Sequence, residues 1–166
     1  MSIEINMVSG DTDIATVAEL AKTIWNEHYT PIIGQKQVDY MIEKFQSAEA
    51  VKNQILQEGY EYYLIHSDEN PVGYIGIKLK DDDLFLSKLY LLKEYRGKGF
   101  GSEALAFIVG RAGQLHVSSV SLTVNKNNVN SIRAYEKMGF QNLGPVVADI
   151  GNGYVMDDYI MKLPLD

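Results

Sequence analysis

Cysteine is absent from this 166-residue sequence, and so is any apolar run approaching the roughly 18 residues that would cross a bilayer. The first absence excludes disulfides, thiolate metal sites and cysteine nucleophiles, and the second excludes a membrane-spanning helix. Proline is scarce too, with four residues, and no low-complexity segment or internal repeat divides the chain. Since an average domain has about 150 residues, we expect a single domain over residues 1–166.

Positive charge is also in short supply, because 15 lysines and arginines stand against 22 aspartates and glutamates, for a net charge of −7. Such a chain lacks the positive field that holds proteins on nucleic acids or anionic membranes, so we expect neither as a partner. The start of the chain, MSIEINMVSGDTD, has no basic segment followed by an apolar one, which predicts a cytoplasmic protein. An anionic ligand would have to meet a local basic site.

Hydrophobic periodicity predicts blocks of strands and helices. The predicted helices are residues 14–25, 38–45, 48–55, 104–112 and 128–138, and the predicted strands are residues 3–8, 60–66, 72–79, 84–92, 117–124, 140–150 and 154–163. The strand, helix and strand within residues 84–124 form a unit whose two strands should be parallel. The sequence therefore predicts an α/β fold with a mixed, mostly antiparallel central sheet of about six to seven strands and helices on both faces.

The most informative segment is the cationic, glycine-rich turn Arg96-Gly97-Lys98-Gly99-Phe100-Gly101, which joins a predicted strand to a predicted helix. Glycines let a backbone approach a ligand without Cβ clashes, and the free amides at a helix start favour phosphate oxygens. Arg96 and Lys98 add positive charge to this part of an otherwise acidic chain. The turn therefore predicts an anion cradle, although a glycine triplet alone also suits a solvated surface turn.

Two other phosphate-binding patterns fit this segment less well. No Gly-Lys-Ser or Gly-Lys-Thr closes the turn, which argues against the P-loop of nucleotide triphosphatases. Residues 99–104 match the G-x-G-x-x-G/A dinucleotide pattern, but residues 120–125, about 20 positions further on, hold no Asp or Glu for a ribose. A dinucleotide-binding half is therefore disfavoured.

Two motifs resemble those of the GCN5-related N-acetyltransferases and follow one another in the same order as in that family. Residues 89–101 (LYLLKEYRGKGFG) contain the pattern R-x-x-G-x-G and are similar to the family's acetyl-coenzyme A signature. Residues 128–140 (NVNSIRAYEKMGF) are similar to the family's N-x-x-A-x-x-x-Y-E-K-x-G-F segment, with Ser131 in place of the usual alanine. Lys93 likewise stands where a proline is usual. The order of predicted elements matches as well, so the resemblance covers nearly the whole chain.

This resemblance implies that acetyl-coenzyme A (acetyl-CoA) is the cosubstrate and that backbone groups bind most of it. In the family the pyrophosphate sits on amides of the glycine-rich turn, and the strand before it bonds the pantetheine arm as an added sheet partner. The amide of Leu91 would then have a catalytic role, stabilising negative charge on the thioester oxygen. The residues implied to bind the coenzyme are Leu89, Leu91, Arg96, Gly97, Lys98, Gly99, Gly101, Ser102, Asn128 and Tyr135.

The resemblance also implies that Tyr135 is the catalytic acid that protonates the departing thiolate of coenzyme A. A hydroxyl with a pKa of about 10 suits a sulfur leaving group. Tyr135 follows Asn128 by about two helical turns, so both side chains can face one side of the helix. Taken alone, Asn128 also suits a helix cap, and Tyr135 suits packing in a core.

An acceptor amine must lose a proton before it can attack, because an ammonium has no lone pair. Candidate residues lie in two regions that flank the acceptor in the family, the end of the first long helix and the last hairpin. They are Glu27, His28, Asp157, Asp158 and Tyr159, which we expect to bind the acceptor, with Glu27 as the candidate base. Each also suits a solvated surface position. His66 and His116 show no metal-ligand spacing, and no metal is expected.

The resemblance thus implies an N-acetyltransferase in which a bound amine attacks the thioester directly. The missing cysteine agrees with this, because it leaves no cysteine acyl-enzyme. The net negative charge and the aspartates of the last hairpin predict a small cationic acceptor such as a polyamine. The alternatives are acetylation of a protein amino terminus or lysine, and an inactive acyl-CoA sensor. Dimers are common in the family, so a homodimer stays open.

Overall fold

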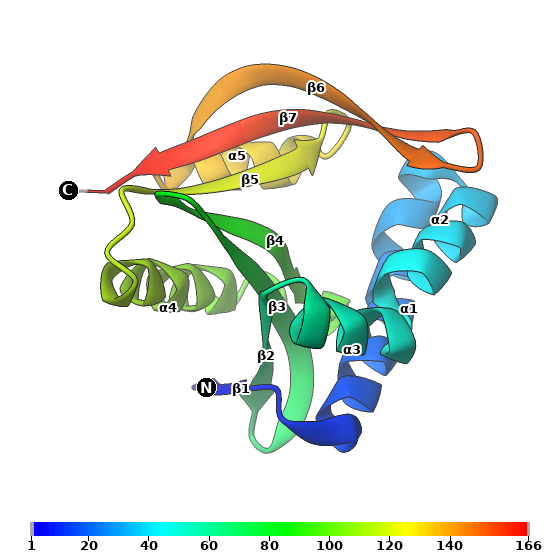
Figure 1. The fold of residues 1–166 in the computed structure, drawn as a ribbon, viewed down its shortest axis with the longest axis horizontal. Coiled ribbons are helices and arrows are strands. Elements are labelled where there is room, and N and C mark those ends of the chain that lie inside the picture. Colours follow the sequence, from blue (N-terminus) through cyan, green and yellow to red (C-terminus); the bar gives the residue numbers. More distant parts are fainter. Residues whose placement is uncertain (1, 166) are drawn as a thin grey trace.

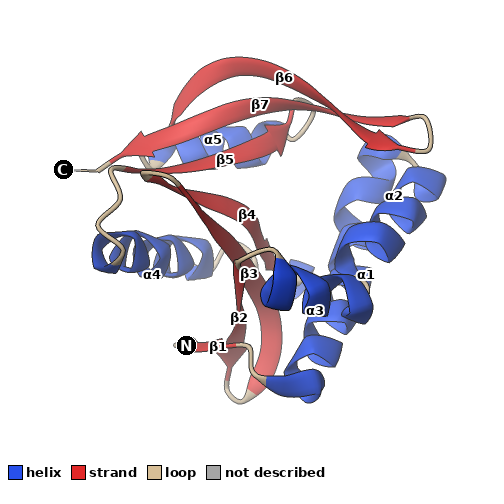
Figure 2. Cartoon of the chain, viewed as in Figure 1, coloured by secondary structure: helices blue, strands red, loops and turns tan. Residues whose placement is uncertain are grey.

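Two hydrophobic cores lie on opposite faces of one seven-stranded sheet in residues 2–165, the part of the chain that the computed structural model describes (Figures 1 and 2). The strands are β1 (Glu4–Met7), β2 (Tyr60–Ser67), β3 (Asn70–Lys80), β4 (Asp83–Leu91), β5 (Ser119–Asn125), β6 (Gln141–Gly151) and β7 (Tyr154–Pro164). The helices are α1 (Gly10–Ile33), α2 (Gln35–Met41), α3 (Ala48–Gln57), α4 (Phe100–Gln114) and α5 (Val129–Lys137), with a π-helical turn η1 (Ile42–Gln46) and a 3-10 turn η2 (Lys93–Tyr95). The predicted mixed sheet with helices on both faces is confirmed.

The strands follow the order β1-β2-β3-β4-β5-β7-β6 across the sheet. Neighbouring strands are antiparallel except β4 and β5, which form the predicted parallel pair with α4 as their connection. Figure 1 shows α1, α2 and α3 gathered on one side of the sheet and α4 on the other. No helix within residues 2–165 has the length and apolar character needed to cross a bilayer.

Apolar periodicity decides which face each helix buries. On α4, Ala104, Leu105 and Ile108 recur at helical spacing and pack into the core shared with β4 and β5. On α1, the apolar stripe continues past Trp25 to Tyr29 and packs against β2 and β3 in the other core. The helix therefore runs about two turns beyond the stripe read from the sequence, and this extension brings its end to the middle of the sheet.

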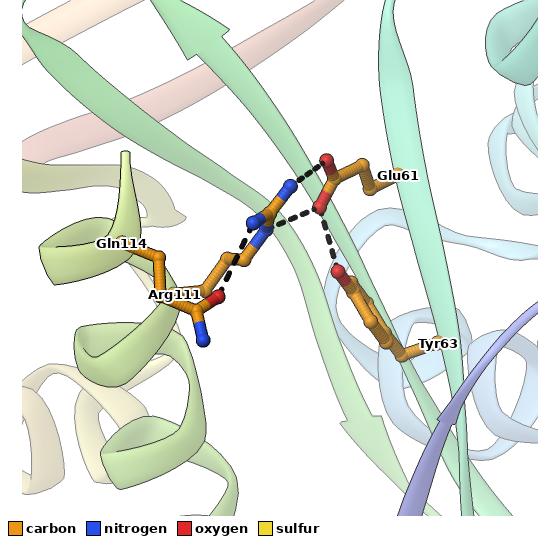
Figure 3. Close-up of polar contacts among 4 residues, drawn as sticks. All are labelled: Glu61, Tyr63, Arg111 and Gln114. Carbon is orange, nitrogen blue, oxygen red and sulfur yellow. Dashed lines mark hydrogen bonds and ion pairs between the residues drawn. The ribbon is translucent and has the colours of Figure 1, made fainter. Parts of the chain in front are cut away.

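A bidentate ion pair between Arg111 and Glu61 connects α4 to β2 (Figure 3). Arg111 Nη2 lies 2.6 Å from Glu61 Oε2, and Arg111 Nε donates to Glu61 Oε1 at 3.0 Å. The hydroxyl of Tyr63 donates to the same Oε1 at 2.6 Å. The bond from the Arg111 guanidinium holds the pKa of Glu61 below its usual value, so the carboxylate stays charged. The helix whose first turn borders the cavity described below is thus fixed relative to the sheet.

Strands β4 and β5 separate soon after they begin. Their parallel register covers only residues 83–85 and 119–121, although β4 continues to Leu91 and β5 to Asn125. At the closed end, the Asp83 carboxylate accepts a hydrogen bond from the hydroxyl of Ser119 at 2.7 Å. Beyond it, the two strands diverge and leave a wedge in the middle of the sheet.

The β6–β7 hairpin reaches across to the helices on the far side of this wedge (Figure 1). The Tyr40 hydroxyl and the Lys44 ammonium both donate to the carbonyl of Ile150, at 2.8 and 2.7 Å. A Cβ added at Gly151 would lie 2.7 Å from the Tyr40 hydroxyl oxygen, so the approach is as close as glycine allows. The hairpin and the α2 region therefore enclose the space in front of the wedge.

Candidate active site

A cavity of about 430 Å³ occupies the wedge between β4 and β5, and we call it the first cavity. Its lining comes from β4, the turn after β4, the start of α4, β5, α5 and the end of α1. The two sequence motifs therefore meet in one place, because residues 89–101 supply one side of the cavity and residues 128–138 supply the other.

The backbone of Leu89 and Leu91 faces into the first cavity. The amide of Leu92 donates to the carbonyl of Val72 on β3 at 2.8 Å. Residues of an antiparallel strand alternately bond their partner strand and face away from it, so Leu91 and Leu89 turn their amides and carbonyls away from β3. No residue of β5 pairs with this part of β4. The Leu91 amide and the Leu89 backbone groups are thus left to bond an extended ligand in the wedge, whereas the Leu91 carbonyl accepts a hydrogen bond from Arg96.

The turn of residues 96–101 leaves free amides at the start of α4. Gly99 directly precedes the helix with a φ of 84°, in the left-handed region, and no side chain caps the helix. The first helical hydrogen bond runs from the Glu103 amide to the Gly99 carbonyl at 3.2 Å, so the three amides before Glu103 lack a helical partner. Gly101 lines the cavity, and nothing lies within 4 Å of where its Cβ would stand. Such a helix start favours a phosphate group.

The two cations of this turn have different positions. Arg96 lines the first cavity, and its Nε donates to the carbonyl of Leu91 at 3.1 Å, which holds the guanidinium over the cavity entrance. Lys98 is exposed and outside the cavity lining, as are Gly97 and Ser102. Any coenzyme contact of these three residues would have to come from the outer part of the turn.

Tyr135 projects from α5 into the first cavity, and its ring packs against Phe140 with 5.4 Å between centroids. Tyr135 therefore packs against the core and also lines the cavity. Burial raises the pKa of Tyr135 well above its usual value, and the nearby Tyr29 hydroxyl adds to the rise. The hydroxyl stays protonated at neutral pH and is able to donate a proton.

Asn128 caps α5 and also joins it to α1. Its side-chain oxygen accepts the amide of Ser131 at 3.4 Å, and its side-chain nitrogen lies 2.9 Å from Nε2 of His28. Burial lowers the pKa of His28, and the charge of Arg96 lowers it further, which favours the neutral imidazole. Asn128 thus has the capping role that it suits when taken alone, and Asn128 and His28 both line the first cavity.

Buried Tyr29 and partly buried Tyr90 complete the cavity lining, and neither was identified from the sequence. The hydroxyl oxygens of Tyr29 and Tyr90 lie 3.0 Å apart, and Trp25 packs edge-on against Tyr90 at 5.6 Å. Burial raises the pKa of Tyr29 to about 12 and that of Tyr90 well above its usual value. Both occupy positions that apolar periodicity assigns to a core. The available signals were two aromatic residues, one at the end of the first predicted helix and one within Leu89-Tyr90-Leu91.

Asp158, predicted on the acceptor side, is only 7% exposed on β7. Its Oδ1 has no hydrogen-bond partner within residues 2–165. Asp158 pairs in register with Asn125 of β5, and its charge acts on the hydroxyl of Tyr29, which lines the cavity. Burial raises the pKa of Asp158 to about 6, and the adjacent Asp157 adds to the rise. A buried carboxylate with an unused oxygen suits a cationic partner.

Of the acceptor candidates, His28 lines the first cavity, whereas Glu27, Asp157, Asp158 and Tyr159 are absent from its lining. Asp157 is exposed and forms an ion pair with Lys126 at 2.9 Å. Tyr159 alternates with Asp158 along β7 and packs against the core on the α4 side. Glu27 is exposed on α1 and does not line the cavity, so the structure does not bring the candidate base to the site. Within the described chain, no three His, Asp or Glu side chains gather in a way that could hold a metal ion.

Known proteins with similar sequences share one kind of chemistry. A sequence model described as "Acetyltransferase (GNAT) family" matches residues 19–140. A spermidine N(1)-acetyltransferase of Thermoplasma acidophilum is 26% identical over 145 residues, which are 85% of this chain and 89% of that protein. A putative ribosomal protein bS18-alanine N-acetyltransferase of Bacillus subtilis is 29% identical over 54% of this chain and 60% of that protein.

Solved structures share the fold. PaiA N-acetyltransferase of Thermoplasma acidophilum, solved in complex with coenzyme A, has a TM-score of 0.83 over 99% of this chain and 100% of that chain, at 24% identity. The ribosomal-protein-S18-alanine N-acetyltransferase of Escherichia coli has a TM-score of 0.74 over 99% of this chain and 95% of that chain, at 17% identity.

Proposed function

The chain belongs to the acetyltransferase (GNAT) family, whose members transfer the acetyl group of acetyl-CoA to an amine, and we propose that its acceptor is a small cationic amine such as a polyamine. The buried, half-unpaired carboxylate of Asp158 carries this proposal, because it lies outside the cavity lining but its charge acts on the Tyr29 hydroxyl, which lines the first cavity. The similarity to a spermidine N(1)-acetyltransferase supports it. A neutral or anionic acceptor would leave that carboxylate without a partner, at a cost of several kcal/mol when it is charged.

The first cavity offers the backbone groups that acetyl-CoA requires. The coenzyme supplies an acetyl group already activated as a thioester. We assign the pantetheine arm to the open backbone of Leu89 and Leu91, and the pyrophosphate to the helix start, where a Cβ at Gly101 would enter free space. The amides assigned to the pyrophosphate are those of Gly97, Lys98, Gly99, Gly101 and Ser102, with further coenzyme contacts from Arg96, Asn128 and Tyr135.

Two groups are assigned to the bond changes. The amide of Leu91 faces the wedge and donates to the thioester oxygen, where it stabilises the negative charge that grows as the amine attacks. The hydroxyl of Tyr135, kept protonated by its buried position, gives its proton to the departing sulfur. The amine attacks directly, so a ternary complex of enzyme, acetyl-CoA and acceptor is required.

The acceptor enters from the side enclosed by α1, α2 and the β6–β7 hairpin. Asp158 holds a cationic group of the acceptor, and Tyr29 and His28 line the path to the thioester. Asp157 is at the rim, where its pairing with Lys126 leaves it a smaller role. Glu27 and Tyr159 have no assigned contact, because Glu27 is exposed on α1 and Tyr159 packs against the core on the α4 side.

Thiol release from acetyl-CoA, measured across a panel of acceptors, tests the proposal. The panel holds diamines, spermidine, spermine, amino sugars and peptides with a free amino terminus. We expect the highest kcat/KM for the polyamines. Preference for peptides that begin with alanine would instead favour the activity named for the relative that is 29% identical. Tight coenzyme binding without turnover on any amine would mark an acyl-CoA sensor.

Asp158→Asn is expected to raise the KM for a polyamine about tenfold, because a charge-assisted contact is replaced by a neutral one. The KM for acetyl-CoA should stay unchanged, since Asp158 lies outside the coenzyme part of the cavity. Asp157→Asn is the matched control and should change the acceptor KM less, because Asp157 is exposed and already paired with Lys126. Equal effects of the two variants would remove Asp158 from the acceptor site.

The same Asp158→Asn substitution should stabilise the fold above pH 6. The carboxyl has a pKa of 3.8 in an unconstrained chain and about 6 in the fold, so the fold binds this proton more tightly. Charged Asp158 therefore destabilises the fold above pH 6, and the cost disappears below about pH 4. Urea unfolding should show a large gain for the variant at pH 7.5, a smaller gain at pH 5 and none at pH 3.5. A variant no more stable than the wild type at pH 7.5 would contradict the buried charge.

A further inference from the structure

Lys88 of β4 lines a second cavity and follows directly on Ser87, which lines the first. This second cavity has a volume of about 340 Å³ and lies between β4, the start of β2 and the α3 region. Lys88 lines it together with Lys44, Glu58 and Tyr60, whereas the neighbouring Ser87 lines the first cavity. Two residues adjacent in sequence thus line one cavity each.

A β-bulge brings the side chains of Ser87 and Lys88 together. On β3, Ile77 pairs with Leu86 and Gly76 pairs with Lys88, so Ser87 has no partner on that strand. Neighbouring side chains of a regular strand point to opposite faces, but a bulge redirects them. Lys88 Nζ accordingly donates to Ser87 Oγ at 2.6 Å.

Lys88 is buried without a carboxylate partner. Its residue exposure is 9%, and no ion pair within residues 2–165 includes it. Its Nζ lies 5.2 Å from the centre of the Tyr60 ring and 5.9 Å from that of Tyr62. A Cβ at Gly76 would lie 3.3 Å from its Cδ, so the stem of the lysine is also closely packed.

The groups that face Lys88 do not compensate its charge. They are Tyr60 and Tyr62 on β2, Glu58 at the end of α3, Lys44 on η1, and Lys78 on β3, whose Nζ lies 5.2 Å from the same Tyr60 ring. Burial lowers the pKa of Lys88 to about 8, and the more distant Glu58 only partly opposes this. About half of Lys88 is therefore a neutral amine at pH 8, and about a tenth at pH 7, with a lone pair able to accept a proton.

We propose, on the premise of the acetyl transfer described above, that Ser87 and Lys88 carry away the proton that the acceptor amine must lose. The acceptor ammonium gives a proton to Ser87 Oγ while the Ser87 hydroxyl proton moves to the lone pair of Lys88 Nζ. Lys88, now an ammonium, releases the proton to water in the second cavity. The freed amine then forms the C–N bond as the C–S bond breaks, and the sulfur takes the proton of Tyr135. The attacking nitrogen loses its second proton as the amide forms, and this proton restores the Tyr135 hydroxyl.

A cationic acceptor favours the neutral form of Lys88 at the moment when it is needed. An ammonium that approaches Ser87 brings a like charge within a few ångströms of Lys88 Nζ, which lowers the pKa of the lysine further. The second cavity lies on the other side of Lys88 from the coenzyme site, so the proton can leave without crossing the reacting groups.

The dependence of kcat on pH tests this route, with acetyl-CoA and the best acceptor both saturating. Wild-type kcat should rise with pH and level off with a midpoint somewhat below the value of about 8 for free Lys88, because kcat reports the complex in which the acceptor charge lowers this pKa further. Lys88→Met and Ser87→Ala should each lower kcat about tenfold at pH 8 and abolish this midpoint. Ser87→Thr keeps a hydroxyl and should restore most of the rate. Lys78→Met is the matched control. Lys78 also lies over the Tyr60 ring, but it lines neither cavity.

Two outcomes would overturn the proposal. The first is a Lys88→Met enzyme with wild-type kcat and an unchanged midpoint. The second is a midpoint near 6 that disappears in Asp158→Asn, which would give the proton to Asp158 instead.

An NMR titration of the lysine side chains provides a readout that needs no turnover. One lysine, absent from the spectrum of Lys88→Met, should titrate near pH 8. If that signal titrates near its ordinary 10.5, the relay is excluded even if no amine on the panel is acetylated. Failure of the panel with a lysine titrating near 8 would instead count against the proposed acceptor class and not against Lys88.

Discussion

Replacing Gly101 by valine is expected to weaken acetyl-CoA binding about 100-fold, or about 2.7 kcal/mol, without unfolding the protein. Gly101 lies in the first turn of α4 with ordinary helical φ, and nothing within the protein stands within 4 Å of its missing Cβ. A valine side chain would therefore be accepted by the fold and would fill the space assigned to the coenzyme phosphates. Titration of the single tryptophan, Trp25, which packs against Tyr90 of the cavity, can follow binding.

Two alanine variants separate the effect on binding from the effect on stability. Gly101→Ala should raise helix stability by up to about 1 kcal/mol and still weaken coenzyme binding. Gly110→Ala is the matched control, because Gly110 is an exposed glycine of the same helix that lies away from the cavity. It should give a similar gain in stability with wild-type affinity. Gly99 is a poorer target, since its φ of 84° strains any other residue. Wild-type affinity in a folded Gly101→Val protein would exclude the phosphate assignment.

Tyr135→Phe is expected to lower kcat by about 100- to 1,000-fold, because coenzyme A would have to leave as an unprotonated thiolate. The ring would keep its contact with Phe140, so acetyl-CoA affinity and the unfolding transition should change little. Burial holds the pKa of Tyr135 well above its usual value, and the wild-type rate should therefore not fall between pH 8 and pH 10 through loss of this proton.

Tyr95→Phe provides a control of the same chemistry for this prediction. Tyr95 packs on Phe100 with 6.4 Å between ring centroids but does not line the first cavity, so its hydroxyl should be dispensable. Rapid mixing that separates acetyl transfer from product release would show whether the step lost in Tyr135→Phe is the chemical one. A Tyr135→Phe enzyme with wild-type single-turnover rates would assign the proton to another donor.

The order of elements followed from local patterns in the sequence. Apolar stripes predict helices because one helical face is buried. The three β-rich segments within residues 60–92 predict a meander because Asp, Asn and Pro residues, which favour turns, lie between them. The backbone part of the site was predictable for a similar reason. The turn of residues 96–101 and the helix after it create free amides by geometry, whatever the side chains around them.

The side-chain part of the site was less predictable, because it depends on contacts between distant elements. Asp157 and Asp158 look equivalent in sequence, but the strand pairing buries Asp158 and leaves Asp157 to bind Lys126. Lys88 occupies a strand position where periodicity expects an apolar residue. Its contact with Ser87 depends on a bulge for which the sequence carries no turn signal. Glu27 was plausible by position along the chain, but the rotation of α1 turns it to solvent.

The short ladder between β4 and β5 also bears on the mechanics of the whole molecule. Within the sheet, only three residue pairs join β1–β4 to β5–β7, so we expect the two parts to move relative to each other about this short ladder. A pantetheine arm bonded to β4 lies where further rungs of the ladder would be. Coenzyme binding would then reduce the motion of the two parts of the sheet. Amide hydrogens of β4 and β5 would exchange more slowly in the liganded protein than in the free one. In this respect the coenzyme is a temporary part of the sheet as well as a reactant.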